Sequence, residues 1–470
     1  MSRAIIRLFL FFALLFAFLV AWASRWTVFE ASSLNHDPLN RLPLYAALRV
    51  KEGRILADNG EVLAKSVPAG GGTWRRVYPT GSLFAQVIGY ANALEGQYAG
   101  LERSDLAWLK GTGLGLSSVF GPAGGRQVGD DIYTTLDPKG QEEARAALAG
   151  RAGAVVAIEP RTGAVLVLYA NPTYDDNRPS AGGSQFDVAT QAQDPPGSTF
   201  KIVTATAAID TGRYTPQSLI NGHSPIIVSG VPLHNDANEQ YGLIPLSEAF
   251  TYSVNTVFAQ VGEHVGIPTM TRYMRRFGFY AKPPIDLPRS ELAVSHVLAP
   301  DGRAYPAGSP DEDIGRIAIG QGGLAVTPLQ MAMVVAAVAD GGRLMTPHIT
   351  ARIVNQDGQT VKTVGPTLYK RVMSARTAAE VTQMMRKVVE EGTGTPAQIG
   401  NLQVAGKTGT ASIGPSGSGL TEPWFVAFAP VQDPKVAVAV TVQRTVGGYG
   451  ATVAAPIARD VIETLLAEGR

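Results

Sequence analysis

Cysteine is absent from this chain of 470 residues. The absence excludes disulfide bonds, thiolate chemistry and metal sites with cysteine ligands. Histidine is scarce, and the six residues are scattered without a metal-binding spacing such as His-Glu-x-x-His. We therefore expect neither a metal nor another cofactor.

An excess of charge of one sign is absent as well. The 40 basic and 39 acidic side chains leave a net charge of +1. Proteins that bind nucleic acid usually carry a strongly basic surface, so we expect no nucleic-acid partner. The chain beyond residue 26 is long enough for two domains rather than one.

Long apolar runs are absent except for one near the N-terminus. Residues 8–23 are apolar without interruption, and only Arg7 separates them from the apolar residues 4–6. The stretch of about 20 residues can cross a bilayer as a helix. Arg3 and Arg7 precede it, which predicts a cytoplasmic N-terminus and an exported remainder. A cleaved signal peptide is the alternative, because residues 21–23 (Ala-Trp-Ala) have the form of a cleavage site.

Residues 27–150 are predicted to form a small β-rich domain, a pedestal or docking module without a catalytic constellation. Residues 54–64 place an Asn-Gly turn between alternating apolar positions, which is a strong hairpin signal. We also expect a short helix or strand at 82–90, a helix at 100–109, a flexible glycine-rich loop at 111–125, a strand at 131–137 and a helix from Pro138 to about residue 148.

Residues 151–470 carry strand patterns at both ends and helical patterns between them. This order predicts an α+β domain with one antiparallel sheet, assembled from the two ends of the domain around a helical insert. The expected strands are 154–158, 164–170, 425–428 and 436–442, and the expected helices are 198–209, 244–261, 328–339 and 377–391.

Ser198 and Lys201 form the first candidate catalytic pair. Two prolines and Gly197 end the preceding structure, and a helix is predicted to start at Ser198. Lys201 then lies one turn later on the same face. A desolvated lysine loses its proton more easily and can activate a serine hydroxyl. Taken alone, the Ser-x-x-Lys pattern is common, and an exposed lysine after a helix cap is the ordinary explanation.

Two further polar motifs follow. Ser253-Val254-Asn255 supplies a hydroxyl and an amide that could relay a proton and hold a substrate amide, although such residues near a helix end are more often caps. Lys407-Thr408-Gly409-Thr410 is predicted at a strand start. Gly409 would let a peptide approach the strand edge, where the Thr410 N–H would be a free donor. A plain glycine turn with a surface lysine is the alternative.

The three motifs together, in this order and in one domain, form the set of penicillin-binding proteins and serine β-lactamases. The chain resembles a class B penicillin-binding protein, a monofunctional D,D-transpeptidase of peptidoglycan synthesis. The resemblance implies a membrane anchor at 1–26, a pedestal at 27–150 and a transpeptidase domain at 151–470, whose antiparallel sheet has helices on both faces and a helical subdomain. The flanking residues 195–201, 319–322 and 406–411 also match the family pattern.

The resemblance implies a role for each motif residue. Ser198 would attack the penultimate D-Ala carbonyl of a stem peptide, and Lys201 would accept its proton. Ser253 would pass a proton to the departing D-Ala, while Asn255 binds the substrate amide and contacts Lys201. The backbone N–H groups of Ser198 and Thr410 would form the oxyanion hole.

The third motif would bind the substrate. By the same resemblance, Lys407 supplies positive charge, and Thr408 and Thr410 hold the substrate carboxylate beside Gly409. The amino group of a neighbouring stem peptide would then resolve the acyl-enzyme and form the cross-link. β-Lactams would acylate Ser198 without ready release. A SEDS-type membrane glycosyltransferase is the expected partner, and the catalytic domain would lie outside the bacterial membrane.

Other functions of the same serine remain open at this stage. A D,D-carboxypeptidase or β-lactamase would use water as the acceptor. Val254 stands where class A β-lactamases have Asp, and no Glu-x-x-Leu-Asn stretch is present, with residues 291–295 only superficially close; both features favour a transpeptidase. A membrane-anchored β-lactam sensor is disfavoured because few residues precede the apolar stretch.

Overall fold

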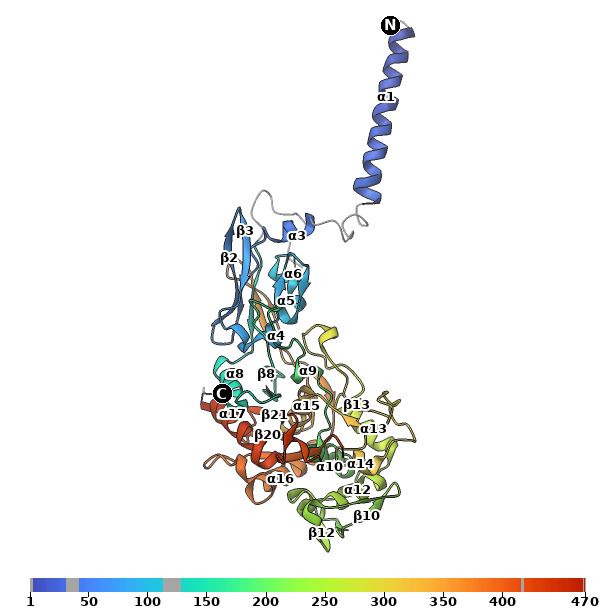
Figure 1. Ribbon diagram of the computed structural model, residues 1–470, viewed down its shortest axis with the longest axis vertical. Helices are drawn as coiled ribbons and strands as arrows, with labels where there is room; N and C mark the ends of the chain where they lie inside the picture. Colours follow the sequence, from blue (N-terminus) through green and yellow to red (C-terminus); the bar gives the residue numbers. More distant parts are fainter. Residues whose placement is uncertain (1–2, 31–41, 113–127, 416–417, 468, 470) are drawn as a thin grey trace.

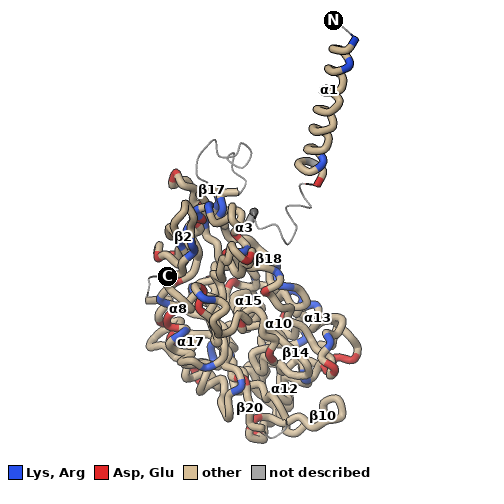
Figure 2. Tube along the Cα trace, turned by 45° about the horizontal axis from the view of Figure 1, so that its top comes forward, with Lys and Arg blue, Asp and Glu red and all other residues tan. Residues whose placement is uncertain are grey.

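The computed structural model describes residues 3–30, 42–112, 128–415, 418–467 and 469 (Figure 1). Its first element is α1 (Arg3–Ser24), a helix of 22 residues with no buried residue. Figure 2 shows that charged residues lie only near the two ends of this helix. The stretch Arg3–Thr27 is long and apolar enough to cross a membrane, in agreement with the predicted span.

The pedestal is built on the predicted hairpin. β1 (Ile55–Leu56) pairs antiparallel with β2 (Val62–Gly70), and Gly60 adopts φ +86° in the turn, a conformation that glycine accepts without a steric penalty. β2 also pairs antiparallel with β3 (Thr73–Val77), and β1 pairs in parallel with β6 (Asp131–Thr134).

The strand predicted at 131–137 is too long, because β6 ends at Thr134. The Asp137 side chain accepts a hydrogen bond from the Gly140 N–H and caps α8 (Pro138–Leu148). Asp137 keeps an extended backbone, but its N–H donates to Leu166 O at 2.8 Å, so the chain has already left the pedestal sheet there. The helix itself has the predicted bounds.

The stretch predicted as a helix or strand at 82–90 is helical, and the predicted helix at 100–109 is divided in two at Asp105. Of the predicted loop 111–125, only its first two residues belong to the described residues. The remaining elements of this region are α3 (Leu42–Ala47), η2 (Gly81–Leu83), α4 (Ala85–Ile88), β4 (Ala91–Asn92), β5 (Gln97–Tyr98), α5 (Gly100–Ser104) and α6 (Leu106–Leu109).

Two strands from far along the chain complete the pedestal sheet. β16 (Thr350–Val354) pairs antiparallel with β6, and β17 (Thr360–Thr363) pairs with β16. The sheet order is β17-β16-β6-β1-β2-β3. The chain therefore leaves the second domain at β16 and β17 to add two strands to the pedestal sheet, and then returns to the second domain. The boundaries 1–26, 27–150 and 151–470 stay predictions.

The central sheet of the second domain joins both ends of that domain, as predicted. Its strands run in the order β19-β20-β21-β7-β8, with antiparallel pairing throughout. The short β22 (Thr445–Val446) pairs with the start of β20. The strands are β7 (Gly153–Ile158), β8 (Val165–Asn171), β19 (Ala405–Ser412), β20 (Leu420–Ala429) and β21 (Val436–Val442).

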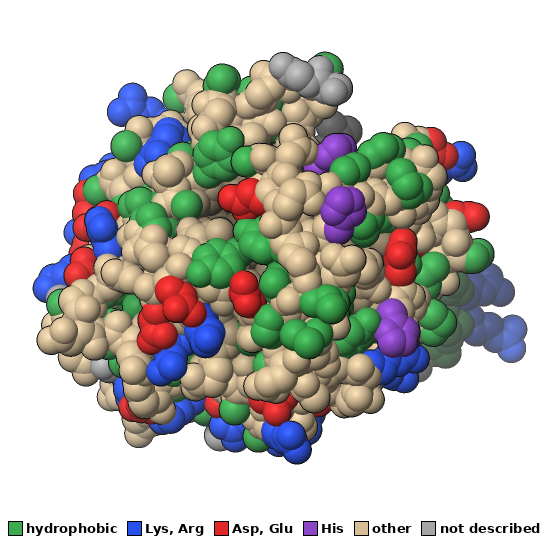
Figure 3. Space-filling model, turned by 90° about the horizontal axis from the view of Figure 1, so that it is seen from below, with side chains coloured by type: hydrophobic (Ala, Val, Ile, Leu, Met, Phe, Trp, Pro, Cys, Tyr) green, Lys and Arg blue, Asp and Glu red, His purple; other side chains and the backbone are tan. Residues whose placement is uncertain are grey.

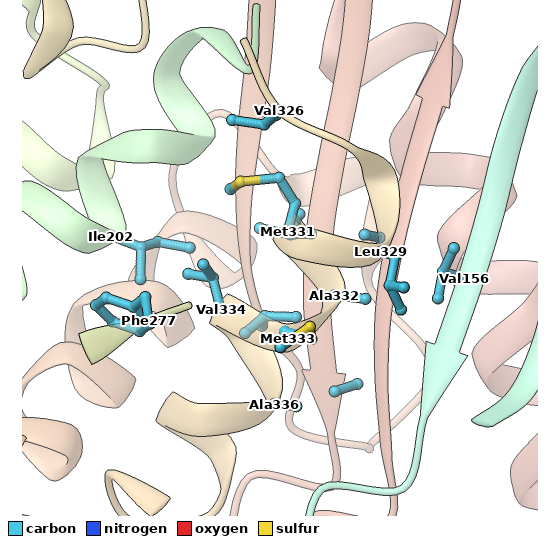
Figure 4. Close-up of a cluster of buried hydrophobic side chains, with 14 of the residues drawn as sticks. Val156, Ile202, Phe277, Val326, Leu329, Met331, Ala332, Met333, Val334 and Ala336 are labelled. Carbon is cyan, nitrogen blue, oxygen red and sulfur yellow. The ribbon is translucent and has the colours of Figure 1, made fainter. Parts of the chain in front are cut away.

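Helices cover both faces of this sheet, which explains why its strands are apolar on both sides. On one face, α15 (Pro328–Ala339) is buried, and Figure 4 shows Leu329 directed at Val156 of β7 while Val334 faces Ile202 and Phe277. On the other face lie α8 and α17 (Ala455–Ala467). Burying one such side chain contributes about 1.5–3 kcal/mol.

The single helix predicted at 244–261 is wrong. The chain forms β12 (Leu243–Pro245), then α11 (Leu246–Thr251), and starts α12 (Asn255–Val265) only after a break. Ser253 adopts φ +61° in this break, a conformation that no α-helix contains. The interruption falls on the second motif.

The rest of the second domain consists of short strands and helices. Its helical part includes α9 (Val188–Gln191), η3 (Gly197–Phe200), α10 (Lys201–Asp210), η4 (Asp236–Asn238), α13 (Ile267–Arg276), η5 (Arg289–Glu291), α14 (Ile314–Ile317), α16 (Ala375–Glu390), η6 (Thr395–Ala397) and η7 (Gly450–Ala454). Its remaining strands are β9 (Leu219–Asn221), β10 (Ile226–Val228), β11 (Val231–Leu233), β13 (His296–Val297), β14 (Leu324–Ala325), β15 (Arg343–Met345) and β18 (Leu368–Arg371).

Candidate active site

Ser198 lies in the 3₁₀ turn η3, not in an α-helix as the sequence suggested. A 3₁₀ turn has three residues per turn, so Ser198 and Lys201 still lie one above the other. Gly197 adopts φ +52°, and its N–H donates to Gly320 O at 3.0 Å. A Cβ on Gly320 would lie 1.8 Å from Gly197 O, so only glycine at 320 allows this hydrogen bond to the turn that contains Ser198.

Lys201 is fully buried, and its amine joins the first motif to the second. Lys201 Nζ lies 2.6 Å from Ser253 O, 3.2 Å from Ser253 Oγ and 2.7 Å from Asn255 Oδ1. Among these described residues, no hydrogen bond links the amine to the Ser198 hydroxyl. Catalytic hydrogen bonds often tighten only when substrate binds, so the missing bond does not exclude Lys201 as the base for Ser198.

Ser253 connects the two lysines. Lys407 Nζ donates to Ser253 Oγ at 2.9 Å and to Thr408 O at 3.1 Å. The break between α11 and α12 makes this possible, because φ +61° at Ser253 turns the chain out of the helix there. The three motifs of the sequence therefore meet at one hydroxyl.

The electrostatics of the site lower the pKa values of both lysine amines. Burial lowers the pKa of Lys201 well below its ordinary value, the charge of Lys407 lowers it further, and Asp236 opposes this fall. Burial also lowers the pKa of Lys407, to about 7, again against the opposing charge of Asp236. An ammonium loses its water on burial and is disfavoured relative to the amine.

The third motif lies within an edge strand. β19 begins at Ala405 and contains all four motif residues, so the predicted strand start at Lys407 is two residues too late. A Cβ on Gly409 would lie 2.7 Å from Pro196 O, so glycine is needed here for the packing of β19 against the chain before Ser198; the approach of a peptide stays a prediction. Thr410 lies opposite Pro423. Proline has no N–H to donate to the neighbouring strand. A residue paired with proline typically directs its own N–H away from that strand, which for Thr410 is toward the open edge of the sheet.

Two hydrogen-bond partners of the third motif were not predicted from the sequence. Thr408 Oγ1 lies 2.6 Å from Thr393 Oγ1, just after α16. The Gly450 N–H donates to Thr410 Oγ1 at 3.1 Å. Each partner orients one motif hydroxyl. In the sequence, only nearby glycines distinguish these two positions. Among the residues with described positions, no group of three or more His, Asp or Glu could hold a metal ion.

The partly buried carboxyl group of Asp194 and the buried carboxyl group of Glu422 lie close enough for their charges to interact. Asp194 precedes the Pro-Pro-Gly sequence, and its Oδ2 accepts from Gln443 Nε2 at 2.6 Å. Glu422 of β20 lies opposite Ala411 of β19 and is only 5% exposed. Burial raises the pKa of Glu422 to about 8, the charge of Asp194 adds to this rise, and Arg444 opposes it.

The raised pKa of Glu422 predicts a pH-dependent stability. The folded state keeps a proton that the unfolded state loses near pH 4.5, so the contribution of Glu422 falls as pH rises from about 4.5 to 8. Glu422→Gln keeps the shape of the protonated acid without the charge. We expect this variant to be more stable than the parent above pH 8, by roughly 2–4 kcal/mol, and nearly unchanged below pH 5.

Thermal unfolding at pH 5 and at pH 8.5 measures this difference. Glu61→Gln is the matched control, because Glu61 is exposed in the pedestal hairpin and should change little at either pH. A Glu422→Gln variant that loses stability at pH 8.5, or that differs equally at both values, would contradict the prediction.

Residues 153–463 match the family model of the penicillin binding protein transpeptidase domain. The chain belongs to the penicillin-binding transpeptidases. It is therefore an enzyme of the penicillin-binding, acyl-transferring type. Within the pedestal of this transpeptidase, residues 52–118 match the dimerisation domain of penicillin binding protein A.

Relatives of this penicillin-binding transpeptidase cover nearly its whole length. The peptidoglycan D,D-transpeptidase PbpA of Mycolicibacterium smegmatis is 33% identical, with 97% of each chain covered. Penicillin-binding protein A from M. tuberculosis, solved as a penicillin G acyl-enzyme complex, superimposes with TM-score 0.77 at 31% identity, covering 88% of this chain and 99% of that one. The D,D-transpeptidase domain of a peptidoglycan glycosyltransferase from Eggerthella lenta gives TM-score 0.78 at 31% identity, covering 90% and 99%.

Proposed function

We propose that this enzyme cross-links peptidoglycan stem peptides through an acyl-enzyme on Ser198 and that β-lactams acylate the same serine. The observation that carries the proposal is the buried Lys201 amine, one 3₁₀ turn after Ser198 and 3.2 Å from Ser253 Oγ. A nucleophile, a desolvated base and a second hydroxyl thus meet in one place. The acyl-enzyme complex of the M. tuberculosis relative supports this assignment.

The hydrogen bonds of Lys201 are compatible with a neutral base. A neutral amine has two N–H groups and one lone pair. The two N–H groups fit Ser253 O and Asn255 Oδ1, at 2.6 and 2.7 Å. The lone pair is then free to take the proton of Ser198. In the next step Ser253, which contacts both lysines, would carry a proton to the departing D-Ala nitrogen.

The edge of β19 suits an extended stem peptide. A peptide that adds to this edge would receive main-chain hydrogen bonds, and the N–H groups of Ser198 and Thr410 would stabilise the oxyanion. The hydroxyls of Thr408 and Thr410 would hold the D-Ala carboxylate beside Gly409. This carboxylate would also raise the pKa of Lys407 and keep its charge.

The apolar helix α1, a candidate membrane span, supports a membrane location for the activity. We infer that the N-terminus is cytoplasmic and that the catalytic domain lies on the outer side, because Arg3 and Arg7 precede the apolar run. A SEDS-type glycosyltransferase in the same membrane is the proposed source of uncross-linked glycan strands. Exposure of the domain to external protease in intact cells tests the orientation.

The acyl-enzyme is expected to persist in water and to be released mainly by an amine. Rapid hydrolysis needs a base that aims water at the ester, and the sequence has no deacylation motif. Glu291, in the superficially similar stretch, instead accepts a hydrogen bond from the Gly100 N–H at 2.9 Å. After a penicillin pulse, mass spectrometry should show one lasting adduct, and a D-Ala-D-Ala peptide with an amine should give a cross-linked product.

The alternatives predict other outcomes of the same measurement. Rapid loss of the adduct with many turnovers of hydrolysed penicillin would identify a β-lactamase. Hydrolysis of the D-Ala-D-Ala peptide without transfer to the amine would identify a D,D-carboxypeptidase. A lasting adduct with no reaction of the peptide would indicate a β-lactam sensor.

A further inference from the structure

The loop around Asp236 is tied directly to the Ser-x-Asn motif. Asn255 Nδ2 donates to His234 O at 3.2 Å, and the Thr256 N–H donates to Asn235 Oδ1 at 3.0 Å. The buried Asn235 side chain also donates to Gly222 O at 3.0 Å. These bonds fix the position of Asp236 relative to the residues that hold Lys201.

The backbone that follows Asp236 is strained. Ala237 and Asn238 adopt φ +50° and +57°, and a left-handed conformation costs alanine about 1–2 kcal/mol. Strain of this kind persists where the surrounding structure holds it, often at functional sites. Here the strain falls in the loop whose preceding residues bond to Asn255 and Thr256.

Asp236 itself is unpaired. Its carboxylate forms no hydrogen bond or ion pair with any described residue, yet its charge acts on both Lys201 and Lys407 and opposes the fall of both pKa values. Figure 3, seen from the end of the molecule that carries β10, β12 and α12, shows acidic side chains among hydrophobic and histidine side chains. An exposed carboxylate without a partner is free to take a cationic ligand.

We propose that Asp236 binds the ammonium group of the acceptor and thereby selects cationic amines for the transfer step. This inference rests on the proposed function and adds a specificity residue to it. The three motifs account for the donor peptide, its carboxylate and the leaving group. Asp236 supplies the negative charge that an incoming ammonium requires.

The groups present in the site can carry every proton of the transfer step. The ammonium held by Asp236 gives one proton to the neutral Lys201 amine. Its nitrogen then forms the C–N bond to the acyl carbon, and the C–O bond to Ser198 breaks. A second proton of the attacking nitrogen passes to Ser198 Oγ, and Lys201 releases its proton to water.

The test compares two acceptors in the full chain, solubilised in detergent. The ε-amine of Nα-acetyl-lysine is an ammonium at pH 7, whereas hydroxylamine is mostly neutral. For Asp236→Asn we expect the acceptor KM for Nα-acetyl-lysine to rise about five- to tenfold relative to that for hydroxylamine. Asp236→Glu should recover part of the preference. Glu239→Gln, which removes an exposed carboxylate from the same loop, should keep the ratio of the parent.

Three outcomes would overturn the inference. The first is an unchanged ratio of the two acceptor KM values in Asp236→Asn. The second is an equally large change of that ratio in Glu239→Gln. The third is slower hydrolysis without amine in Asp236→Asn, which would make Asp236 a water-activating base. Penicillin uptake shows that a variant has a folded site, and Asp236→Ser carries the test if Asp236→Asn does not fold. A parent chain that takes up no penicillin on Ser198 would instead refute the proposed function.

Discussion

Ser198→Ala is expected to abolish covalent labelling by penicillin and the formation of cross-linked product. Loss of a catalytic serine costs on the order of 10⁶-fold in serine hydrolases that form acyl-enzymes. No other serine of the described chain combines a turn supported by glycine with a buried lysine three residues later. Labelling with a fluorescent penicillin, followed by peptide mapping, measures the effect and locates the adduct.

Ser309→Ala provides the matched control. Ser309 lies in a loop, and its side chain accepts one hydrogen bond, from the Asp311 N–H at 3.3 Å. This variant should label like the parent chain. Undiminished labelling of Ser198→Ala, or an adduct mapped to another serine of the parent, would remove Ser198 from the nucleophile role.

Lys201→Arg is expected to reduce the acylation rate by roughly 10³- to 10⁴-fold. General-base catalysis contributes up to about 10⁴-fold, and arginine stays protonated and cannot act as a base. A larger, permanently charged group would also have to replace a fully buried amine. The second-order rate constant for penicillin acylation, measured by stopped-flow or by quenched labelling, reports this loss.

Lys387→Arg controls for the substitution itself. Lys387 is exposed on α16 and pairs with Glu391 at 3.6 Å, a contact that arginine can replace. Unfolding midpoints of both variants separate a catalytic defect from a folding defect. A folded Lys201→Arg variant that acylates close to the parental rate would exclude Lys201 as the base and direct attention to Lys407.

The local sequence determined several features of this protein. The Asn-Gly turn specified the pedestal hairpin, the uninterrupted apolar run specified α1, and the strand patterns at the two ends of the second domain specified its central sheet. These features depend on residues that are adjacent in the sequence, where periodicity and turn chemistry act directly. For the same reason the motif spacing of Ser198 and Lys201 was informative, since i and i+3 meet in a helical turn of either kind.

The tertiary structure decided what depends on residues far apart in the sequence. A pattern of apolar residues cannot show that the chain leaves the helix at Ser253, because contacts from Lys201 and Lys407 hold that turn. Nor can it show that β16 returns to the pedestal, or that Thr393 meets Thr408. The position of the unpaired Asp236 carboxylate likewise depends on the hydrogen bonds between its loop and α12. Local propensity differs by about 1 kcal/mol or less per residue, so packing and buried hydrogen bonds outweigh it wherever distant segments meet.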